Sequence, residues 1–99
     1  MKEKIEALCR MITEQSQERL TEQGLGCEAN LKNQVAHSKD GNKYTKVDRG
    51  GSGFLMIENS TGMIFGIKAY GQIHRGHSFG TLDTIGQWDW SNFYPVKRG

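Results

Sequence analysis

The 99-residue sequence has little cysteine, a single proline and almost no excess of charge of either sign. Its two cysteines, Cys9 and Cys27, are too few for a disulfide framework and lack the spacing of a zinc finger. The formal net charge is +2, whereas domains that bind long nucleic acids usually carry a strong basic excess. The composition therefore predicts neither a disulfide-stapled secreted domain nor a protein that binds long nucleic acid.

Long apolar runs are also missing from the sequence. No segment approaches the ~20 apolar residues of a membrane-spanning helix, and the charged N-terminus is not followed by the apolar stretch of a signal peptide. We therefore expect a cytoplasmic protein with no membrane partner. Apolar residues make up 35% of this single domain, residues 1–99, and a core this thin suggests that a homo-oligomer supplies part of the burial.

Residues 2–23 have the periodicity of one amphipathic helix, and Gly24 provides a stop directly after it. The apolar stripe is narrow and weakens at Ser16, which suits packing on a sheet or on a partner helix. Cys9 falls on this stripe and is expected to pack as a small hydrophobe. The apolar positions of the stripe are Ile5, Leu8, Cys9, Ile12 and Leu20.

Residues 25–99 show the alternation and turn signals of an antiparallel sheet, followed by an aromatic tail. Asp40-Gly41 is a hairpin signal, because tight turns of this kind need a positive backbone φ. The fold class is therefore α+β, with a long N-terminal helix (1–24) followed by an antiparallel sheet of about four or five strands. Strands are predicted at 28–37, 42–47, 54–57 and 63–67, with a flexible glycine-rich connection at 48–53 and a turn at 59–62.

The stretch GIKAYGQIHRGHSFG, residues 66–80, follows the last predicted strand and combines glycines, histidines, cations and aromatic rings. Glycine lets a backbone approach a ligand closely and aim its N–H groups at phosphate oxygens. Aromatic rings offer faces on which a base can stack, each stacked base being worth ~1–3 kcal/mol. The mixture favours a site for a nucleotide-sized anion.

Each candidate residue has an expected role in such a site. Cationic side chains would contact phosphate, aromatic rings would stack a base or line its pocket, and the remaining polar groups would bond ribose or orient the cations. The apolar neighbours of Phe65 in the sequence also suggest a core position for this residue. The candidate ligand-binding residues are Arg49, Lys68 and Arg75 for phosphate, Phe65, Tyr70 and Phe79 for the base, and His74, His77 and Asp83 for the remaining contacts.

The two histidines also permit catalysis, since one imidazole can accept a proton while the other donates one. The alternative function is therefore a small phosphodiesterase or nuclease that uses His74 and His77. A shared metal would need a third ligand such as Asp83 or Asp89, and neither spacing is diagnostic. No nucleophile-elbow, Walker or dinucleotide pattern is present. We expect no enzyme activity, no metal and no cofactor.

The C-terminal aromatic residues suggest a third function, because tryptophan and tyrosine are frequent anchors of protein interfaces. The protein would then be a small binding module, for example a phage inhibitor of a host enzyme. The same side chains are better explained as a tail that folds back over the core. They are Trp88, Trp90, Phe93 and Tyr94.

Residues 43–91 resemble a class of small proteins found in bacteriophages and prophages. The resemblance lies in KYTKVD, in TGMIFGIK and in IHRGHSFGTLDT, and it covers about half of the chain. Size, helix-then-sheet order and expected oligomerisation are similar to those of the first described Thoeris anti-defence family.

That resemblance implies a non-enzymatic sponge that sequesters cyclic ADP-ribose isomers without cleaving them. Some members of the family also hold cyclic di- or trinucleotides, the signals of other anti-phage systems such as CBASS. It further implies a homo-oligomer, a dimer or higher such as a hexamer, with ligand pockets at its subunit interfaces, working in the cytoplasm of an infected host cell. The candidate residues named above rest on their own chemistry and not on this resemblance.

Overall fold

A computed structural model describes residues 2–69, 72–91 and 95–97, and gives only the backbone of residues 68, 69, 72 and 75. The elements in chain order are helix α1 (Lys2–Glu22), helix α2 (Glu28–Lys32), strands β1 (Ala36–Lys39), β2 (Tyr44–Arg49), β3 (Ser52–Glu58), β4 (Met63–Ala69) and β5 (Gln72–Thr81), the 3-10 helix η1 (Ile85–Gln87), and strands β6 (Trp88–Asp89) and β7 (Val96–Lys97).

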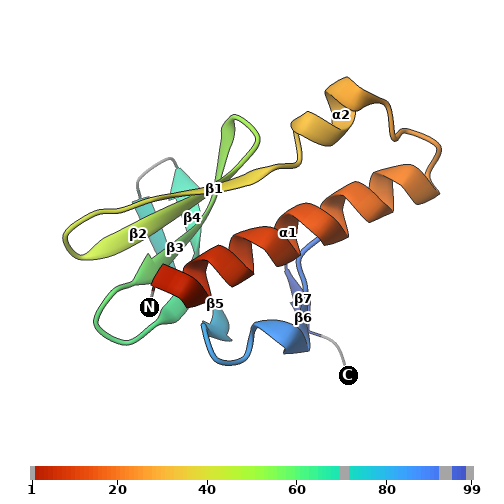
Figure 1. The fold of residues 1–99 in the computed structure, drawn as a ribbon. Coiled ribbons are helices and arrows are strands. Elements are labelled where there is room, and N and C mark those ends of the chain that lie inside the picture. The colour runs from red at the N-terminus through yellow and green to blue at the C-terminus, as the bar shows by residue number, and fades with distance from the viewer. Residues whose placement is uncertain (1, 70–71, 92–94, 98–99) are drawn as a thin grey trace.

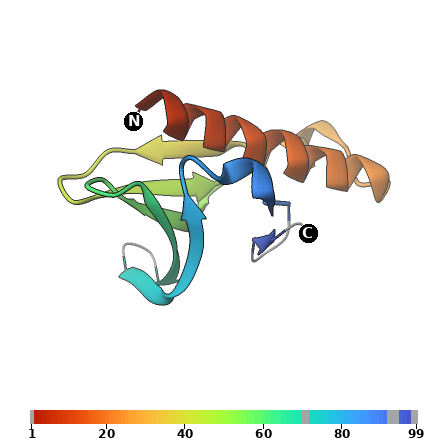
Figure 2. The same ribbon diagram turned by 90° about the horizontal axis from the view of Figure 1, so that it is seen from below.

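The five longer strands form one antiparallel sheet in the order β1-β2-β3-β4-β5, so that each strand pairs with the next one along the chain. Figure 1 shows α1 lying across this sheet, and Figure 2 shows the outer parts of β4 and β5 bending away from the helix. A separate two-stranded sheet joins β6 to β7. The predicted α+β fold, with a long N-terminal helix and an antiparallel sheet of five strands, is confirmed.

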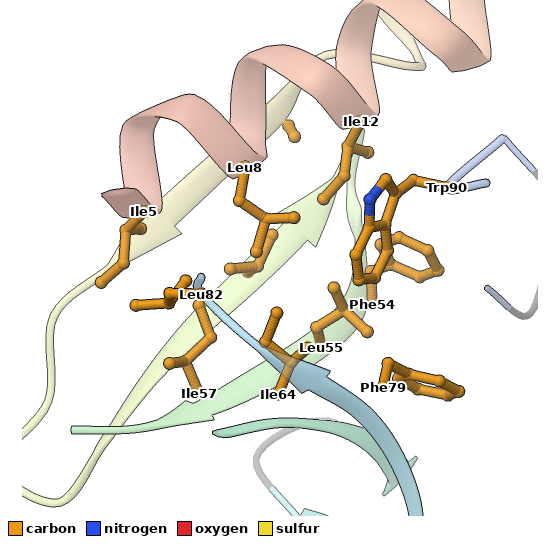
Figure 3. Packing of buried hydrophobic residues seen from close by; sticks show 12 residues of the cluster. Ile5, Leu8, Ile12, Phe54, Leu55, Ile57, Ile64, Phe79, Leu82 and Trp90 are labelled. Atoms are coloured by element: carbon orange, nitrogen blue, oxygen red, sulfur yellow. The ribbon is translucent and has the colours of Figure 1, made fainter. Parts of the chain in front are cut away.

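The predicted apolar stripe of α1 faces the sheet. Ile5, Leu8 and Ile12 point toward apolar side chains of the central strands (Figure 3), and Leu8 and Ile12 are fully buried. Full burial of one such side chain stabilises the fold by about 1.5–3 kcal/mol. Ser16 continues the stripe with a buried hydroxyl, where the predicted face weakens. The apolar cluster that they contact includes Val47, Phe54, Leu55, Ile57, Ile64, Phe79, Leu82 and Trp90.

The predicted strand at 28–37 is wrong. Residues 28–32 form the short helix α2, and only the last part of the predicted range enters β1, which ends at Lys39. The loose alternation of Ala29, Leu31 and Val35 does not mark a buried face of a strand, because Ala29 is exposed and no residue of α2 is buried. Without a buried face, this segment has no packing that would favour a strand over a helical turn.

The glycine-rich connection predicted at 48–53 is also wrong. Strand β2 continues to Arg49 and β3 begins at Ser52, so that only Gly50 and Gly51 make the turn. Gly50 has φ of +63°, which suits a tight hairpin turn. The hairpins predicted around residues 40–41 and 59–62 are confirmed by the β1–β2 and β3–β4 pairings.

The aromatic tail packs onto the core, as the sequence predicted for it. Trp90 is fully buried, and its backbone N–H donates a hydrogen bond of 2.7 Å to Gln15 Oε1 in α1. Its indole N–H donates to the carbonyl of Ile85 at 3.0 Å. Phe93 and Tyr94 lie outside the described residues. In the part of the chain that the structure describes, no helix is long and apolar enough to cross a membrane.

Candidate functional site

The candidate site begins at an irregularity in β5, the strand that the sequence did not predict. Phe65 of β4 pairs with Ser78, but the next residue, Gly66, pairs with His74. Residues 75–77 are therefore inserted between two successive pairs, as a bulge of three extra residues in β5. Bulges of this kind often lie next to functional sites, because they redirect a side chain away from the regular pleat.

The bulge brings His74 and His77 together. In a regular strand, residues three apart point to opposite faces and lie about 10 Å apart along the chain. Here the two imidazole rings are stacked, with centroids 4.1 Å apart and planes inclined by 22°. The bulge therefore brings the two imidazoles into contact, which the spacing of the residues in the sequence left open.

Two glycines make room for this pair. A Cβ at Gly66 would lie 3.2 Å from Cβ of His77, and a Cβ at Gly76 would lie 3.1 Å from Cε1 of His74. Both distances are tighter than ordinary van der Waals contact, so a side chain at either position would shift the neighbouring histidine by a few tenths of an ångström. The glycines in this stretch therefore allow close packing of the histidines.

A hollow of about 350 Å³ lies beside the exposed face of the pair. The indole of Trp88 meets the ring of Phe79 edge to face, with centroids 5.6 Å apart. His77 is exposed and Trp88 is half-buried, so both rings are accessible to a ligand. We refer to this hollow as the β5 hollow; the described residues that line it are Gly76, His77, Ser78, Phe79 and Trp88.

The chemistry of the β5 hollow suits a flat, polar ligand. Its aromatic rings offer faces for a base, while the Ser78 hydroxyl and the imidazole of His77 offer hydrogen-bonding groups. Cleavage by two histidines needs the nitrogens of both imidazoles beside the substrate. Of the two, only His77 is among the described residues that line the hollow.

Arg49 lies away from this hollow and is engaged with the core. Its guanidinium stacks over the Phe54 ring at 4.1 Å and donates a hydrogen bond of 3.0 Å to the carbonyl of Trp90. A longer contact of 3.5 Å reaches the Ser16 hydroxyl. Burial lowers the pKa of Arg49, because a guanidinium loses hydration there. The structure thus places Arg49 where it ties β2 to α1 and to the tail.

The other predicted residues are scattered. Phe65 is 5% exposed, and Phe79 is 8% exposed and reaches both the core and the β5 hollow. Asp83 is exposed and accepts a hydrogen bond from the Lys4 ammonium of α1. His77 and Phe79 therefore line the β5 hollow, with His74 stacked on His77. Arg49 and Asp83 are not among its described lining residues.

Three predicted residues have no described side chain. Lys68 lies in β4 and Arg75 lies in the bulge of β5, but the structure describes only their backbones. Tyr70 lies outside the described residues. Among the residues that are described, no group of three or more histidine, cysteine, aspartate or glutamate side chains is placed to hold a metal ion.

The sequence did not assign Trp88 to this site. It predicted a core or partner-binding role for that residue, and the signal for its position is weak because Trp88 is nine residues beyond Phe79. The turn after β5 and the 3-10 helix η1 return the chain so that the indole meets Phe79. Local contacts contribute to that return, because Gly80 has φ of +74° and the Thr84 hydroxyl accepts a hydrogen bond from the backbone N–H of Thr81.

Similarity to known proteins does not assign the chain to a family. No family model, curated protein or solved structure matches it. The resemblance to the anti-defence family therefore stays a prediction, and the residues around the β5 hollow are the basis for a functional proposal.

Proposed function

We propose that the protein is a sponge that binds and sequesters a small cyclic nucleotide, such as a cyclic ADP-ribose isomer or a cyclic di- or trinucleotide, without cleaving it. The observation that carries the proposal is the β5 hollow, where a strand bulge presents accessible aromatic and imidazole rings around one cavity. Sequestration of an immune signal would place the protein in the cytoplasm of an infected host cell.

A base is the part of the ligand that fits the β5 hollow best. Trp88 and His77 offer ring faces, and stacking of a base on an aromatic ring is worth ~1–3 kcal/mol. The phosphates would then lie toward the crest of the bulge, where the chain carries Arg75 and its neighbouring backbone N–H groups. Cations and backbone donors of this kind are the usual partners of phosphate oxygens.

Binding without turnover is supported by the different positions of the two histidines. His77 lines the β5 hollow, whereas His74 is not among its described lining residues and its Nδ1 is buried, so the hollow presents one imidazole and not an acid–base pair. Trp90 is likewise a poor anchor for a partner protein, because it is fully buried and hydrogen-bonded at both its nitrogens. These contacts support the sponge over the phosphodiesterase and the protein-binding module.

A homo-oligomer belongs to the same proposal. The β5 hollow measures about 350 Å³, near the lower end of the range of about 300–1,000 Å³ for small-molecule pockets. A cyclic dinucleotide is larger than one base, so residues of a second copy of the chain would enclose the part that the β5 hollow does not hold. This geometry supports ligand pockets at subunit interfaces.

The proposal is tested by retention and release. The purified protein is mixed with a cyclic ADP-ribose isomer, separated from free nucleotide by gel filtration, and heated to release what it holds. Chromatography of the released nucleotide should recover the unaltered compound. A chemically altered product would overturn the sponge, and a protein peak without nucleotide would overturn binding.

A pair of variants assigns the retention to the hollow. His77→Ala removes the exposed ring of the site and should lower the amount retained. His37→Ala is the matched control, because His37 is an exposed histidine on the distant edge strand β1. Equal losses in the two variants would show that the β5 hollow is not the binding site.

A further inference from the structure

We infer that His74 is a positioning residue, whose ring holds the imidazole of His77 against the β5 hollow without itself touching the ligand. The inference rests on the proposed function, since it names how one wall of the binding site is fixed. Its basis is that the two rings of the bulge have different surroundings, since only His77 lines the hollow.

The two histidines differ in what they face. His77 is exposed and lines the β5 hollow, whereas His74 is half-buried and is not among the described residues that line it. The ring planes are nearly parallel with centroids 4.1 Å apart, so His74 covers one face of His77. Its stacking restricts the rotamers that an exposed side chain would otherwise sample.

Gly76 leaves space for His74. A Cβ at Gly76 would lie 3.1 Å from Cε1 and 3.4 Å from Nδ1 of His74, so the imidazole closely approaches the crest of the bulge. A Cβ at Gly66, on the neighbouring strand, would lie 3.2 Å from Cβ of His77. The stack therefore occupies space that side chains at these two positions would narrow.

The polar atoms of His74 do not explain its place. Its Nδ1 is buried and has no hydrogen-bond partner among the described residues. A buried nitrogen without a partner is unfavourable, so the ring face, and not the nitrogen, accounts for the contact with His77. A phenyl ring at position 74 should therefore serve as well as an imidazole.

The test compares His74→Ala with His74→Phe. Affinity for a cyclic ADP-ribose isomer is measured by calorimetry, and the ring protons of His77 are followed by NMR in the ligand-free protein. Because the chain has three histidines, His37→Ala and His77→Ala assign their signals. His74→Ala should weaken binding by about 2- to 10-fold, the worth of an aromatic pair, and His74→Phe should restore it.

The NMR readout separates this inference from the proposed function. His77 ring signals in the free protein should lose the ring-current shift in His74→Ala and keep one in His74→Phe, whether or not a nucleotide binds. Unchanged His77 signals in His74→Ala would overturn the inference. Binding by His74→Phe that is as weak as that of His74→Ala would also overturn it, because the imidazole itself would then be needed.

A second variant distinguishes the loss of ring stacking from a folding defect in His74→Ala. Gly76→Ala keeps the imidazole but adds a methyl group 3.1 Å from Cε1 of His74, so the ring must shift by a few tenths of an ångström. A smaller change of the His77 signals than in His74→Ala is expected, with the thermal transition of the protein retained. A Gly76→Ala protein with wild-type His77 signals and wild-type affinity would contradict the inference.

Discussion

Trp88 offers the sharpest test of the β5 hollow, because it is the largest accessible ring there. Trp88→Ala removes the indole that meets Phe79 edge to face at 5.6 Å and opens one wall of the cavity. If a base stacks on this indole, the lost interaction is worth ~1–3 kcal/mol. At 1.4 kcal/mol for each factor of ten, the dissociation constant should rise by about 5- to 150-fold.

The assay is equilibrium dialysis with a cyclic ADP-ribose isomer, which does not depend on tryptophan fluorescence. Trp88→Phe is the matched control, since it keeps a flat ring at the same position and should lose less affinity than Trp88→Ala. Thermal unfolding of each variant establishes that it is folded at the dialysis temperature. A folded Trp88→Ala protein that binds within twofold of the wild type would refute the assignment of a base to this ring.

Three further predictions concern stability and reactivity. Leu8→Ala should lower the free energy of unfolding by about 2–5 kcal/mol in urea titrations, because Leu8 is fully buried against the sheet. Gln15→Leu should cost about 1–3 kcal/mol by the same method, since the backbone N–H of Trp90 loses its acceptor. Burial raises the pKa of Cys9 to about 11, so at pH 8 a thiol reagent should label the exposed Cys27 much faster than Cys9.

Each of these predictions has its own check. Leu25→Ala is the control for core truncation, because Leu25 is 51% exposed and its loss should change the unfolding free energy by less than about 0.5 kcal/mol. A Gln15→Leu protein as stable as the wild type would mean that the Trp90 amide finds another acceptor. The labelling experiment can be extended upward in pH: the Cys9 thiol should become reactive as the pH approaches 11, and early labelling of Cys9 would contradict its burial.

Local sequence patterns were sufficient for the elements that are long or bounded by strong turn residues. The helix at 2–22 follows from apolar residues at helical spacing, and its buried positions Ile5, Leu8 and Ile12 are those of the predicted stripe. The β1–β2 hairpin follows from Asp40-Gly41. In both cases the determining interactions lie within a few residues of one another along the chain.

The site was less predictable, because it depends on contacts between distant segments. The pairing of Gly66 with His74 creates the bulge, and nothing in the sequence of β5 alone specifies where the register changes. Arg49 was predicted to contact phosphate, yet the returning tail supplies the Trp90 carbonyl that its guanidinium binds. Trp88 reaches Phe79 only because the turn and η1 reverse the chain.

The histidine pair shows both what the sequence indicated and what it left open. The sequence placed His74 and His77 close together, and a metal, a catalytic pair and a ligand contact all remained open on that spacing. The structure adds that the two rings stack and that, of the two, only His77 is among the described residues that line the β5 hollow. This arrangement arises from the change of register in β5, which the spacing alone does not specify.

A native mass spectrum of the protein after incubation with a cyclic ADP-ribose isomer tests the central claim most directly. The sponge predicts an oligomer that carries a whole number of intact nucleotides, with the ligand mass unchanged after release. A protein that carries no nucleotide, or one whose released nucleotide has gained the mass of water, would contradict the claim.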